Sequence, residues 1–573
     1  LLRSNEEITR AFESRTDLIA QPFLDPPSNM DALIAPFVTG LPFFFSFPEN
    51  GQYVVTVIIG PDGSMSEPYA WLCSLTGGQS TYGTRCDDLE LLDVCRAYAR
   101  AAAAEGWRGP LNVQLKRTAE GRFVAFELNG RFGGGTAART CLGFDEVGDA
   151  ISRFVPDAAF ASSAAPESDA VQKYLRSYPI PREGLNTLQL TGAWARRPEK
   201  PTRVARAKAP KLRLLVLSVG SLAAQKLIDA LGTRRERCVL IGTNSIAQTS
   251  ANFRCDTVYL VPQASSTDYI DRIAQIIQQE RPDIVIPARD DDVLALAVVG
   301  ERYPPPDQCV LLTGSVAAAR MINDKLQTAR FAARHALPFA ETADNVEAAL
   351  VLARRHGHPI IGKPRSGNAT RGVVLLRSAE EIERAFESNS DFLVQVLLDP
   401  PTDTAALTMP YSAGLPFFFS FPETAQYFLQ IVVGPDGSIS EPLGTLSTQV
   451  GGKAIRTERC ADPELLSIGR AYARATADEG WRGPLNVQLK RAASGSLVAH
   501  ELNGRFSGGT AARVYLGFDE IGEMIKRFLP AVAFPSLSGS ECDVVQNYMY
   551  TEPIPREDLE TLLSTGRWSR TQA

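Results

Sequence analysis

The sequence predicts an α/β and α+β protein of several domains in which one module occurs twice. Its 573 residues exceed the roughly 250 to 300 residues at which a single hydrophobic core stops growing. An internal repeat relates its two ends. Between the repeated parts, apolar runs of strand length alternate with segments of helical periodicity. This alternation predicts a parallel sheet flanked by helices.

The repeat joins residues that lie 374 positions apart. Residues 1–14 read LLRSNEEITRAFES, and residues 375–388 read LLRSAEEIERAFES. The offset continues without insertion as far as Trp194 and Trp568. Each residue of one repeat therefore has a counterpart in the other.

We call residues 1–194 the first copy and residues 211–573 the second copy. Nothing before Leu1 corresponds to the beginning of the second copy, so the first copy contains only the back part of the module. We therefore expect the natural protein to extend upstream by about the length of residues 201–374.

Composition excludes several classes of protein. The chain is 44% hydrophobic and 22% charged, which is typical of a soluble globular protein. A net charge of -6 argues against binding to nucleic acid or to an anionic membrane, and no apolar run approaches the ~18 residues of a membrane span. Nine scattered cysteines without a CxxC pair indicate reduced thiols. We expect a cytoplasmic protein, and homo-oligomer formation stays open.

Two segments between the repeats differ in character. Residues 195–210 are polar, basic and proline-bearing, which predicts a linker. Residues 211–318 carry the alternating strand and helix pattern, which predicts a Rossmann-like domain. Its first turn, residues 218–221, has one glycine and lacks the GxGxxG pattern that lets backbone approach a pyrophosphate. We therefore favour a structural role for this turn over dinucleotide binding.

Residues 485–506 predict a β-hairpin, because two alternating runs flank a polar four-residue turn. If Ala492 pairs with Leu497, antiparallel register brings four polar side chains onto one face. The opposed pairs are Gln488 with Glu501 and Asn486 with Asn503.

Gln488, Glu501 and Asn503 would together offer carboxylate and amide oxygens to one point. Such a set suits Mg²⁺, which prefers oxygen ligands and brings nucleotide phosphates with it, and it suits zinc poorly. A polar, solvent-facing hairpin without a ligand is the alternative. The repeat favours the metal site, since the first copy holds the same residue types at the same spacing. These counterparts are Gln114, Glu127 and Asn129.

Arg505 and its counterpart Arg131 follow the two hairpins at matching places. A cation at this position can stabilise the charge that develops on a transferred phosphoryl group. We therefore predict a catalytic role for both arginines.

With these motifs the sequence resembles the ATP-grasp superfamily, within it the branch of the carbamoyl phosphate synthetase large chain and related carboxylate-amine ligases. The motif from NVQ through ELN to RFSGGT looks like that branch's metal-binding strand pair, with Gln488, Glu501 and Asn503 at the ligand positions. Residues 322–342 resemble the helix that delivers a phosphate-binding lysine, here Lys325. Residues 358–373 resemble the segment with the second lysine and the flexible phosphate loop.

The resemblance implies an ATP site. Its phosphate-binding residues would be Lys325, Lys363, Gly367, Thr370, Arg371 and Gly372. Residues 391–398 look like the hinge strand that holds adenine, at Gln395, Val396 and Leu397. In the strand after the hinge, Gln426 and Gln430 stand where the family commonly has acidic residues.

The implied domains are a Rossmann-like pre-ATP-grasp domain (211–318) and an ATP-grasp domain (319–573), after the back part of a first ATP-grasp domain (1–194). The implied function is ATP-dependent ligation of a small-molecule carboxylate to an amine through an acyl phosphate, with ATP and Mg²⁺ or Mn²⁺. One alternative is an enzyme like carbamoyl phosphate synthase. The other is a nucleotide-binding scaffold with at least one inactive copy, because the copies differ at Tyr82 against Arg456 and at Pro22 against Val396.

Both copies also carry the segment GLPFFFSFPE, at residues 40–49 and 414–423, inside an insertion of about thirty residues relative to the family. One interpretation is a loop that folds over the body with its phenylalanines in the core. The other is a lid or a contact between the copies, because an exposed apolar patch usually marks an interaction site.

Overall fold

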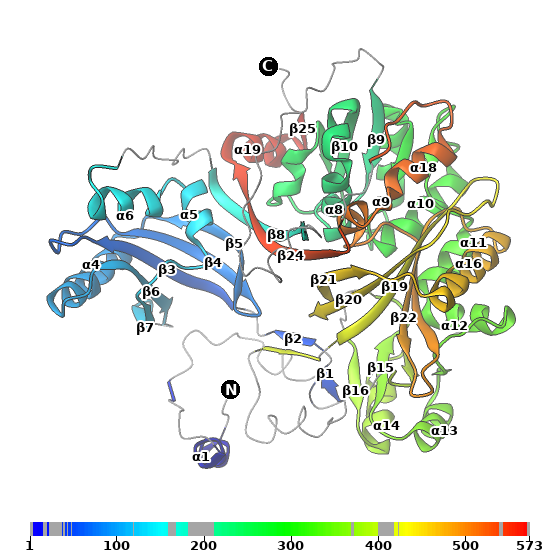
Figure 1. The fold of residues 1–573 in the computed structure, drawn as a ribbon, viewed down its shortest axis with the longest axis horizontal. Helices are drawn as coiled ribbons and strands as arrows, with labels where there is room; N and C mark the ends of the chain where they lie inside the picture. The colour runs from blue at the N-terminus through cyan, green and yellow to red at the C-terminus, as the bar shows by residue number, and fades with distance from the viewer. Residues whose placement is uncertain are drawn as a thin grey trace, which may run out of the picture.

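The structure is a computed structural model. It contains two lobes of unequal size that one continuous sheet connects (Figure 1). None of the helices in the described ranges has the length and apolar character that crossing a membrane requires. The residues described are 4–14, 20–21, 37, 40–42, 44–46, 49–118, 120–158, 168–180, 211–367, 372–398, 418–421, 423–537 and 542–569. The predicted linker, residues 195–210, lies outside them.

A parallel sheet follows the predicted linker, and its strand order is β13-β12-β9-β10-β11. Numbered along the chain and taken from the opposite edge, this order is 3-2-1-4-5, the first five strands of the doubly wound order 3-2-1-4-5-6. Three helices pack on it, and C-terminal strand β25 (Arg567–Ser569) extends its edge antiparallel to β11. The strands are β9 (Leu212–Val216), β10 (Cys238–Asn244), β11 (Thr257–Leu260), β12 (Ile284–Ile286) and β13 (Val310–Leu311). The helices are α8 (Leu222–Leu231), α9 (Tyr269–Glu280) and α10 (Asp290–Arg302).

A smaller antiparallel sheet follows two linking helices, α11 (Val316–Asn323) and α12 (Lys325–Arg334). Alanine and large apolar residues of its two helices and strands form one buried cluster, which holds the helices on one face. Strand β1 (Leu41–Pro42) of the first copy pairs with the edge of this sheet. Its other elements are β14 (Thr342–Ala343), β15 (Ile360–Pro364), β16 (Val374–Leu376), β17 (Phe392–Gln395), α13 (Val346–His356) and α14 (Ala379–Ser388).

The largest sheet has twelve strands in the order β23-β22-β19-β20-β21-β24-β8-β5-β4-β3-β6-β7. Six strands come from each copy. The second copy gives β19 (Glu423–Val433), β20 (Leu443–Val450), β21 (Lys453–Arg459), β22 (Gly483–Arg491), β23 (Leu497–Asn503) and β24 (Val544–Pro555). The first copy gives β3 (Glu49–Ile59), β4 (Tyr69–Thr76), β5 (Gln79–Cys86), β6 (Gly109–Arg117), β7 (Phe123–Asn129) and β8 (Ser168–Ile180).

Three helices of each copy match along the large sheet, α4 with α16, α5 with α17 and α6 with α18, whereas α1 is the counterpart of α14 and lies apart from this sheet (Figure 1). In the second copy, α16 begins at Pro463, which suits a first helical position, and Asp462 caps it by accepting from the Glu464 N–H. In the first copy, Asp88 caps α4 in the same way. The second-copy helices are α16 (Pro463–Asp478), α17 (Thr510–Tyr515), α18 (Glu520–Phe528) and α19 (Arg556–Thr565). The first-copy helices are α1 (Asn5–Ser14), α4 (Leu89–Ala104), α5 (Thr136–Cys141) and α6 (Glu146–Phe154).

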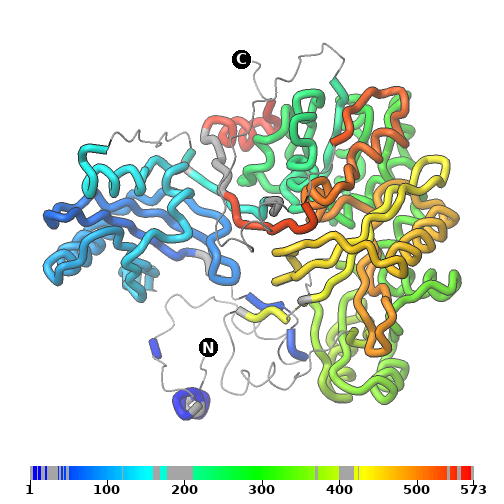
Figure 2. The backbone as a smooth tube through the Cα atoms, in the orientation of Figure 1, coloured from blue at the N-terminus to red at the C-terminus, as the bar shows by residue number. Residues whose placement is uncertain are grey.

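The two halves meet through equivalent strands, β8 and β24, which run side by side across the middle of the molecule (Figure 2). Their antiparallel pairing is centred on Leu175 and Met549, which are counterparts in the repeat. Exchanging the copies therefore exchanges the partners of each pair. This is the geometry of an isologous dimer interface, formed here within one chain.

The GLPFFFSFPE segments meet about the same centre. Strands β2 (Phe44–Ser46) and β18 (Phe418–Ser420) pair antiparallel, with Phe45 opposite its counterpart Phe419. Each segment is also tied to its own copy, because Ser46 Oγ and Ser420 Oγ each accept a backbone N–H at 2.9 Å. The described residues show a contact between the copies, and Phe421 of the same segment is also buried in a cluster with Leu41 and Leu375. The neighbouring residues 43, 47–48, 399–417 and 422 lie outside the described ranges.

Candidate active site

A cavity of about 630 Å³ opens between the small sheet, the second-copy half of the large sheet and the carboxyl ends of parallel strands β9, β10 and β12. Strands β9 and β12 are neighbours at which the chain order reverses, where open α/β sheets bind ligands. Among the described residues, eight lysine and arginine side chains line this cavity against two glutamates. The excess of cations suits an anionic ligand.

The hairpin of β22 and β23 forms one wall. The predicted pairs of Gln488 with Glu501 and Asn486 with Asn503 are confirmed. The predicted pair at the turn is wrong, because Leu497 pairs with Arg491. The register shifts by one residue between Gln488 and Leu489, and this bulge restores the predicted pairing beyond it.

The three predicted metal ligands all line the cavity. Asn503 Oδ1 accepts from the Arg505 guanidinium at 3.1 Å, whereas Gln488 and Glu501 have no hydrogen bond or ion pair within the described part of the chain. Their oxygens are therefore available to a cation. The described residues contain no group of three or more His, Cys, Asp or Glu that is placed to hold a metal ion. A set of one carboxylate and two amides fits a hard ion such as Mg²⁺ that keeps phosphate and water ligands.

The two predicted phosphate-binding lysines enter the cavity from different elements. Lys325 is the first residue of α12, and its Nζ donates to the Gly367 carbonyl at 3.1 Å. Lys363 lies in β15, and its Nζ donates to the His500 carbonyl at 3.3 Å. Burial, together with the charge of Lys325, lowers the pKa of Lys363 to about 7 despite the opposing effect of Glu501. Bound phosphate would restore the proton to Lys363.

Four further residues, of which the sequence analysis named only Gln426, line the cavity beside Lys363. Glu423 and Lys490 form an ion pair at 3.1 Å in which both side chains are about 10% exposed. Gln426 Nε2 donates to His500 Nε2 at 3.0 Å, which requires a neutral ring. Burial, with the charges of three lysines, lowers the pKa of His500 well below its usual value. No alternation in the sequence could place Glu423 and Gln426 on one face, because the register of β19 shifts between them.

The predicted hinge and loop are only partly described. Gln395 and Val396 line the cavity, but Leu397 packs away from it in a cluster with Leu41 and Leu375. Gly367 lines the same cavity, with a positive φ of 138° that favours glycine. Gly372 lies beside an adjoining small cavity. Thr370 and Arg371 lie outside the described residues.

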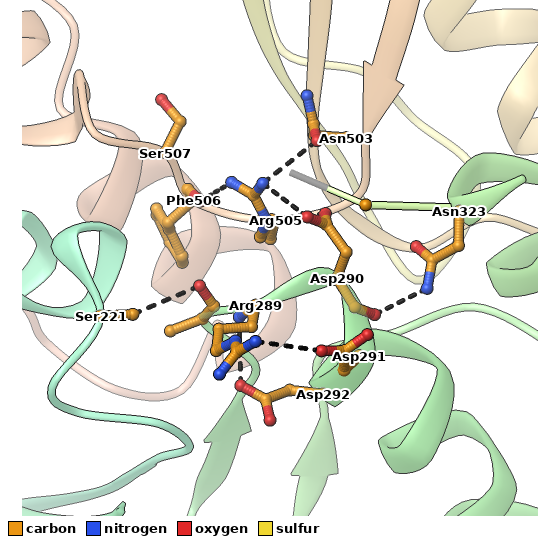
Figure 3. A network of polar contacts seen from close by, with 12 residues as sticks. Ser221, Arg289, Asp290, Asp291, Asp292, Asn323, Asn503, Arg505, Phe506 and Ser507 are labelled. Atoms are coloured by element: carbon orange, nitrogen blue, oxygen red, sulfur yellow. Dashed lines mark hydrogen bonds and ion pairs between the residues drawn. The ribbon is translucent and has the colours of Figure 1, made fainter. Parts of the chain in front are cut away.

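Arg505 lines the cavity, and its side chain is bound by Asp290 at the beginning of α10, on the side of the parallel sheet (Figure 3). Its Nε and one terminal nitrogen donate to the two carboxylate oxygens of Asp290 at 2.7 Å each. The Asp290 carbonyl in turn accepts from Asn323 Nδ2 at 2.6 Å. Because Asp290 begins α10, this bidentate contact fixes the parallel sheet against the hairpin.

The first-copy counterparts lie in different surroundings. Gln114 Oε1 accepts from Gln52 Nε2 at 2.6 Å, and Asn129 Nδ2 donates to Glu127 Oε1 at 3.0 Å. Glu127 and Arg131 are exposed. The structure therefore keeps the three predicted ligands on one hairpin, but two of them are hydrogen-bonded to other side chains of the first copy or to each other.

The far end of the cavity is formed by loops that the sequence did not single out. The turn at residues 218–221, interpreted as structural, lines it together with residues 244–249. The first copy contributes Gln172 and Leu175 from β8. Gln172 Oε1 accepts from both the backbone N–H and the Oγ of Ser250, at 3.0 and 3.1 Å. A residue more than seventy positions from its partner gives no local pattern that reveals such a role.

Comparison with known proteins gives a match in the region of the parallel sheet. No curated protein sequence matches this chain. Among solved structures, it is similar to the biotin carboxylase domain of 2-oxoglutarate carboxylase from Hydrogenobacter thermophilus, solved with MgADP, ADP and bicarbonate (15% identity, 59% of this chain, 73% of that chain, TM-score 0.43).

Two other similar structures are carboxyaminoimidazole ribonucleotide synthase from Aspergillus clavatus with ATP (13% identity, 57% of this chain, 79% of that chain, TM-score 0.43) and biotin carboxylase from Campylobacter jejuni (17% identity, 59% and 74%, TM-score 0.42). The family model that matches is the PylC-like N-terminal domain, and it covers residues 214–304.

Proposed function

We propose that the second copy is an ATP-grasp ligase that joins a carboxylate to an amine through an acyl phosphate. The observation that carries this proposal is one continuous cavity with two ends. One end gathers two lysines and a hairpin of oxygen ligands, which suits a metal-bound polyphosphate. The other end is a polar pocket at the reversal point of the parallel sheet, which suits a second substrate.

Each residue then has a role in positioning and charge neutralisation, which supply most of the catalysis in phosphoryl transfer. Lys325 and Lys363 bind the phosphates of ATP, and Gln488, Glu501 and Asn503 hold the Mg²⁺. The ion supplies charge neutralisation on the phosphate oxygens. The carboxylate substrate attacks the terminal phosphorus and ADP leaves, and the amine then displaces phosphate from the acyl phosphate.

Arg505 is proposed to stabilise the phosphoryl group during transfer, and Asp290 positions its guanidinium. The planar fork of an arginine can donate to Asp290 on one edge while facing the cavity on the other. Arg131 would act likewise only if the first copy also turned over.

The chain organisation is proposed on the repeat and on the match of residues 214–304 to the PylC-like N-terminal domain. A Rossmann-like pre-ATP-grasp domain (211–318) precedes an ATP-grasp domain (319–573). The first copy (1–194) is the back part of another ATP-grasp domain, joined by the linker (195–210). The element bounds of the two copies agree along the twelve-stranded sheet, which supports a duplication.

The test is Mg²⁺-dependent release of ADP with a panel of carboxylates and amines. Glu501→Gln should lower turnover by about 100-fold or more, because it removes the only carboxylate of the ligand set while leaving the shape nearly unchanged. Glu127→Gln is the matched control in the first copy. If Glu501→Gln retained full turnover, the metal assignment would be wrong.

A further inference from the structure

The two copies differ most where the second copy has its substrate pocket. Four polar residues of β20 and β21 line the second-copy cavity, and Ser447 Oγ lies 3.0 Å from Thr457 Oγ1. Each has an apolar counterpart in β4 and β5. The second-copy residues are Thr445, Ser447, Gln449 and Thr457, and their counterparts are Trp71, Cys73, Leu75 and Gly83.

Trp71 fills the corresponding space in the first copy. A Cβ placed on Gly83 would come within 2.4 Å of its ring, and one placed on Gly135 within 2.5 Å. The counterparts of these two glycines are Thr457 and Gly509, which line the second-copy cavity. The indole is 2% exposed, and its cluster includes Cys73 and Val171.

The side chain of Lys173, from β8, also lies in this region of the first copy. Its Nζ donates to Ser80 Oγ at 2.8 Å and to the Gly134 carbonyl at 2.5 Å. The counterparts of these three residues, Asn547, Ala454 and Gly508, line the second-copy cavity. Two larger side chains, one aromatic and one cationic, thus stand in the first copy at the positions of Thr445 and Asn547, which line the second-copy cavity although both are mostly buried.

Strand β8 has acquired a different contact. Gln172 faces the second-copy cavity and holds Ser250 by two hydrogen bonds, whereas its counterpart Gln546 accepts from the Tyr548 hydroxyl of its own strand. Gln172 therefore positions the loop at residues 244–250, which forms one side of that cavity.

Resting on the proposed function, we propose that binding of the second substrate, here called the acceptor, is confined to the second copy: Trp71 and Lys173 close the first-copy pocket, and β8 of the first copy forms a wall of the second-copy pocket through Gln172. The acceptor is a polar small molecule, because hydroxyl and amide side chains line its site. The ATP end of the first copy is outside this proposal.

Transplanting the closure tests the proposal. Thr445→Trp with Thr457→Gly reproduces the first-copy pair in the second copy, and Thr457→Gly alone is the matched control. The double variant should lose acceptor-dependent ADP release by at least about 100-fold, while MgATP still raises its melting temperature. Acceptor-dependent release within twofold of the control would overturn the proposal.

A second measurement does not depend on activity. Iodoacetamide labelling of Cys73, divided by its rate in unfolded protein, measures whether the indole of Trp71 covers this thiol, which is 2% exposed. Trp71→Gly should accelerate labelling of Cys73 but leave Cys95 protected, since Cys95 lies in a separate first-copy core. Equal labelling of Cys73 with and without the indole of Trp71 would show that this side chain does not close the first-copy pocket, whatever reaction the protein catalyses.

The role of Gln172 has its own matched pair. Gln172→Leu should raise the KM for the acceptor several-fold with little change in the KM for ATP, because it releases the loop at residues 244–250. Gln546→Leu should change neither constant. Equal effects of the two substitutions would assign Gln172 a role in folding alone.

Discussion

At the scale of residues, Lys363 gives a prediction about pH. The surroundings of its ammonium group favour loss of the proton, whereas binding of a phosphate favours the protonated form. Burial and the charge of Lys325 lower the pKa of Lys363 to about 7, and bound phosphates would raise it. MgATP binding should therefore take up a proton at neutral to alkaline pH. Affinity should be full below pH 7 and fall by up to about tenfold per pH unit as the pH rises above 7, until the pKa of the bound state is reached.

Calorimetry in buffers of different ionisation enthalpy measures this proton uptake directly. Lys363→Arg is the control, since its guanidinium stays charged throughout this range and should flatten the pH dependence. Unchanged proton uptake in Lys363→Arg would assign the titration to another group.

The contact of Arg505 with Asp290 gives a second prediction. Asp290→Asn should lower turnover about tenfold or more and cost roughly 1–3 kcal/mol of stability, because it removes the charge that holds a buried guanidinium. Asp291→Asn, next in the chain and paired with Arg289 at the surface, should change little. Turnover and melting temperature check both; equal losses in the two variants would contradict a specific role of Asp290.

Some residues of the candidate site could be predicted from the sequence and others could not. Gln488, Glu501 and Lys363 could be predicted because strand alternation and local motifs place them. Asp290 could not, since its partner lies 215 residues away and a run of three aspartates offers no reason to prefer one. Glu423 and Lys490 were missed for the same reason. They lie on the neighbouring strands β19 and β22, far apart in the sequence, so their ion pair exists only in the folded sheet.

At the scale of elements, the bulge in the β22–β23 hairpin decides which side chains face the cavity. A one-residue shift in register would turn Glu501 to the opposite face, because side chains alternate along a strand. The sequence carried the right pairs but not the bulge, since no glycine or proline marks it. The prediction of the pairs was thus right although its starting pair was wrong.

Strand β1 gives a prediction at this scale. Leu41 is 2% exposed and packs with Leu375, Leu397 and Phe421 of the second copy. Leu41→Ala should destabilise the protein by about 2–5 kcal/mol through the cavity it leaves, and should weaken MgATP binding because Leu397 adjoins the hinge. Leu89→Ala, at a position 74% exposed, is the control. Calorimetry and nucleotide titration report both effects, and an unchanged nucleotide affinity would separate Leu41 from the hinge.

At the scale of the whole molecule, the continuous sheet makes the connection between the copies independent of the linker. Twelve residues of β24 pair with β8, and β2 pairs with β18. We predict that cutting a protease site introduced into residues 195–210 leaves the two parts together in native size-exclusion chromatography. Separate elution of the parts would show that the paired strands do not hold them.

The centre of the β8–β24 pairing has a further consequence. Arg176 and Tyr550 are counterparts, and the guanidinium of Arg176 lies 4.7 Å from the Tyr550 ring centre. In a dimer of identical chains, the residue at this position would meet itself, so an arginine would oppose an arginine and repel it. A chain that carries both copies escapes this constraint, because each copy can mutate alone while the other stays at high effective concentration. The attraction between the cation and the ring stabilises the pairing of the two strands by about 0.5–1 kcal/mol at an exposed site. Only a chain in which the two copies can differ can make this contact.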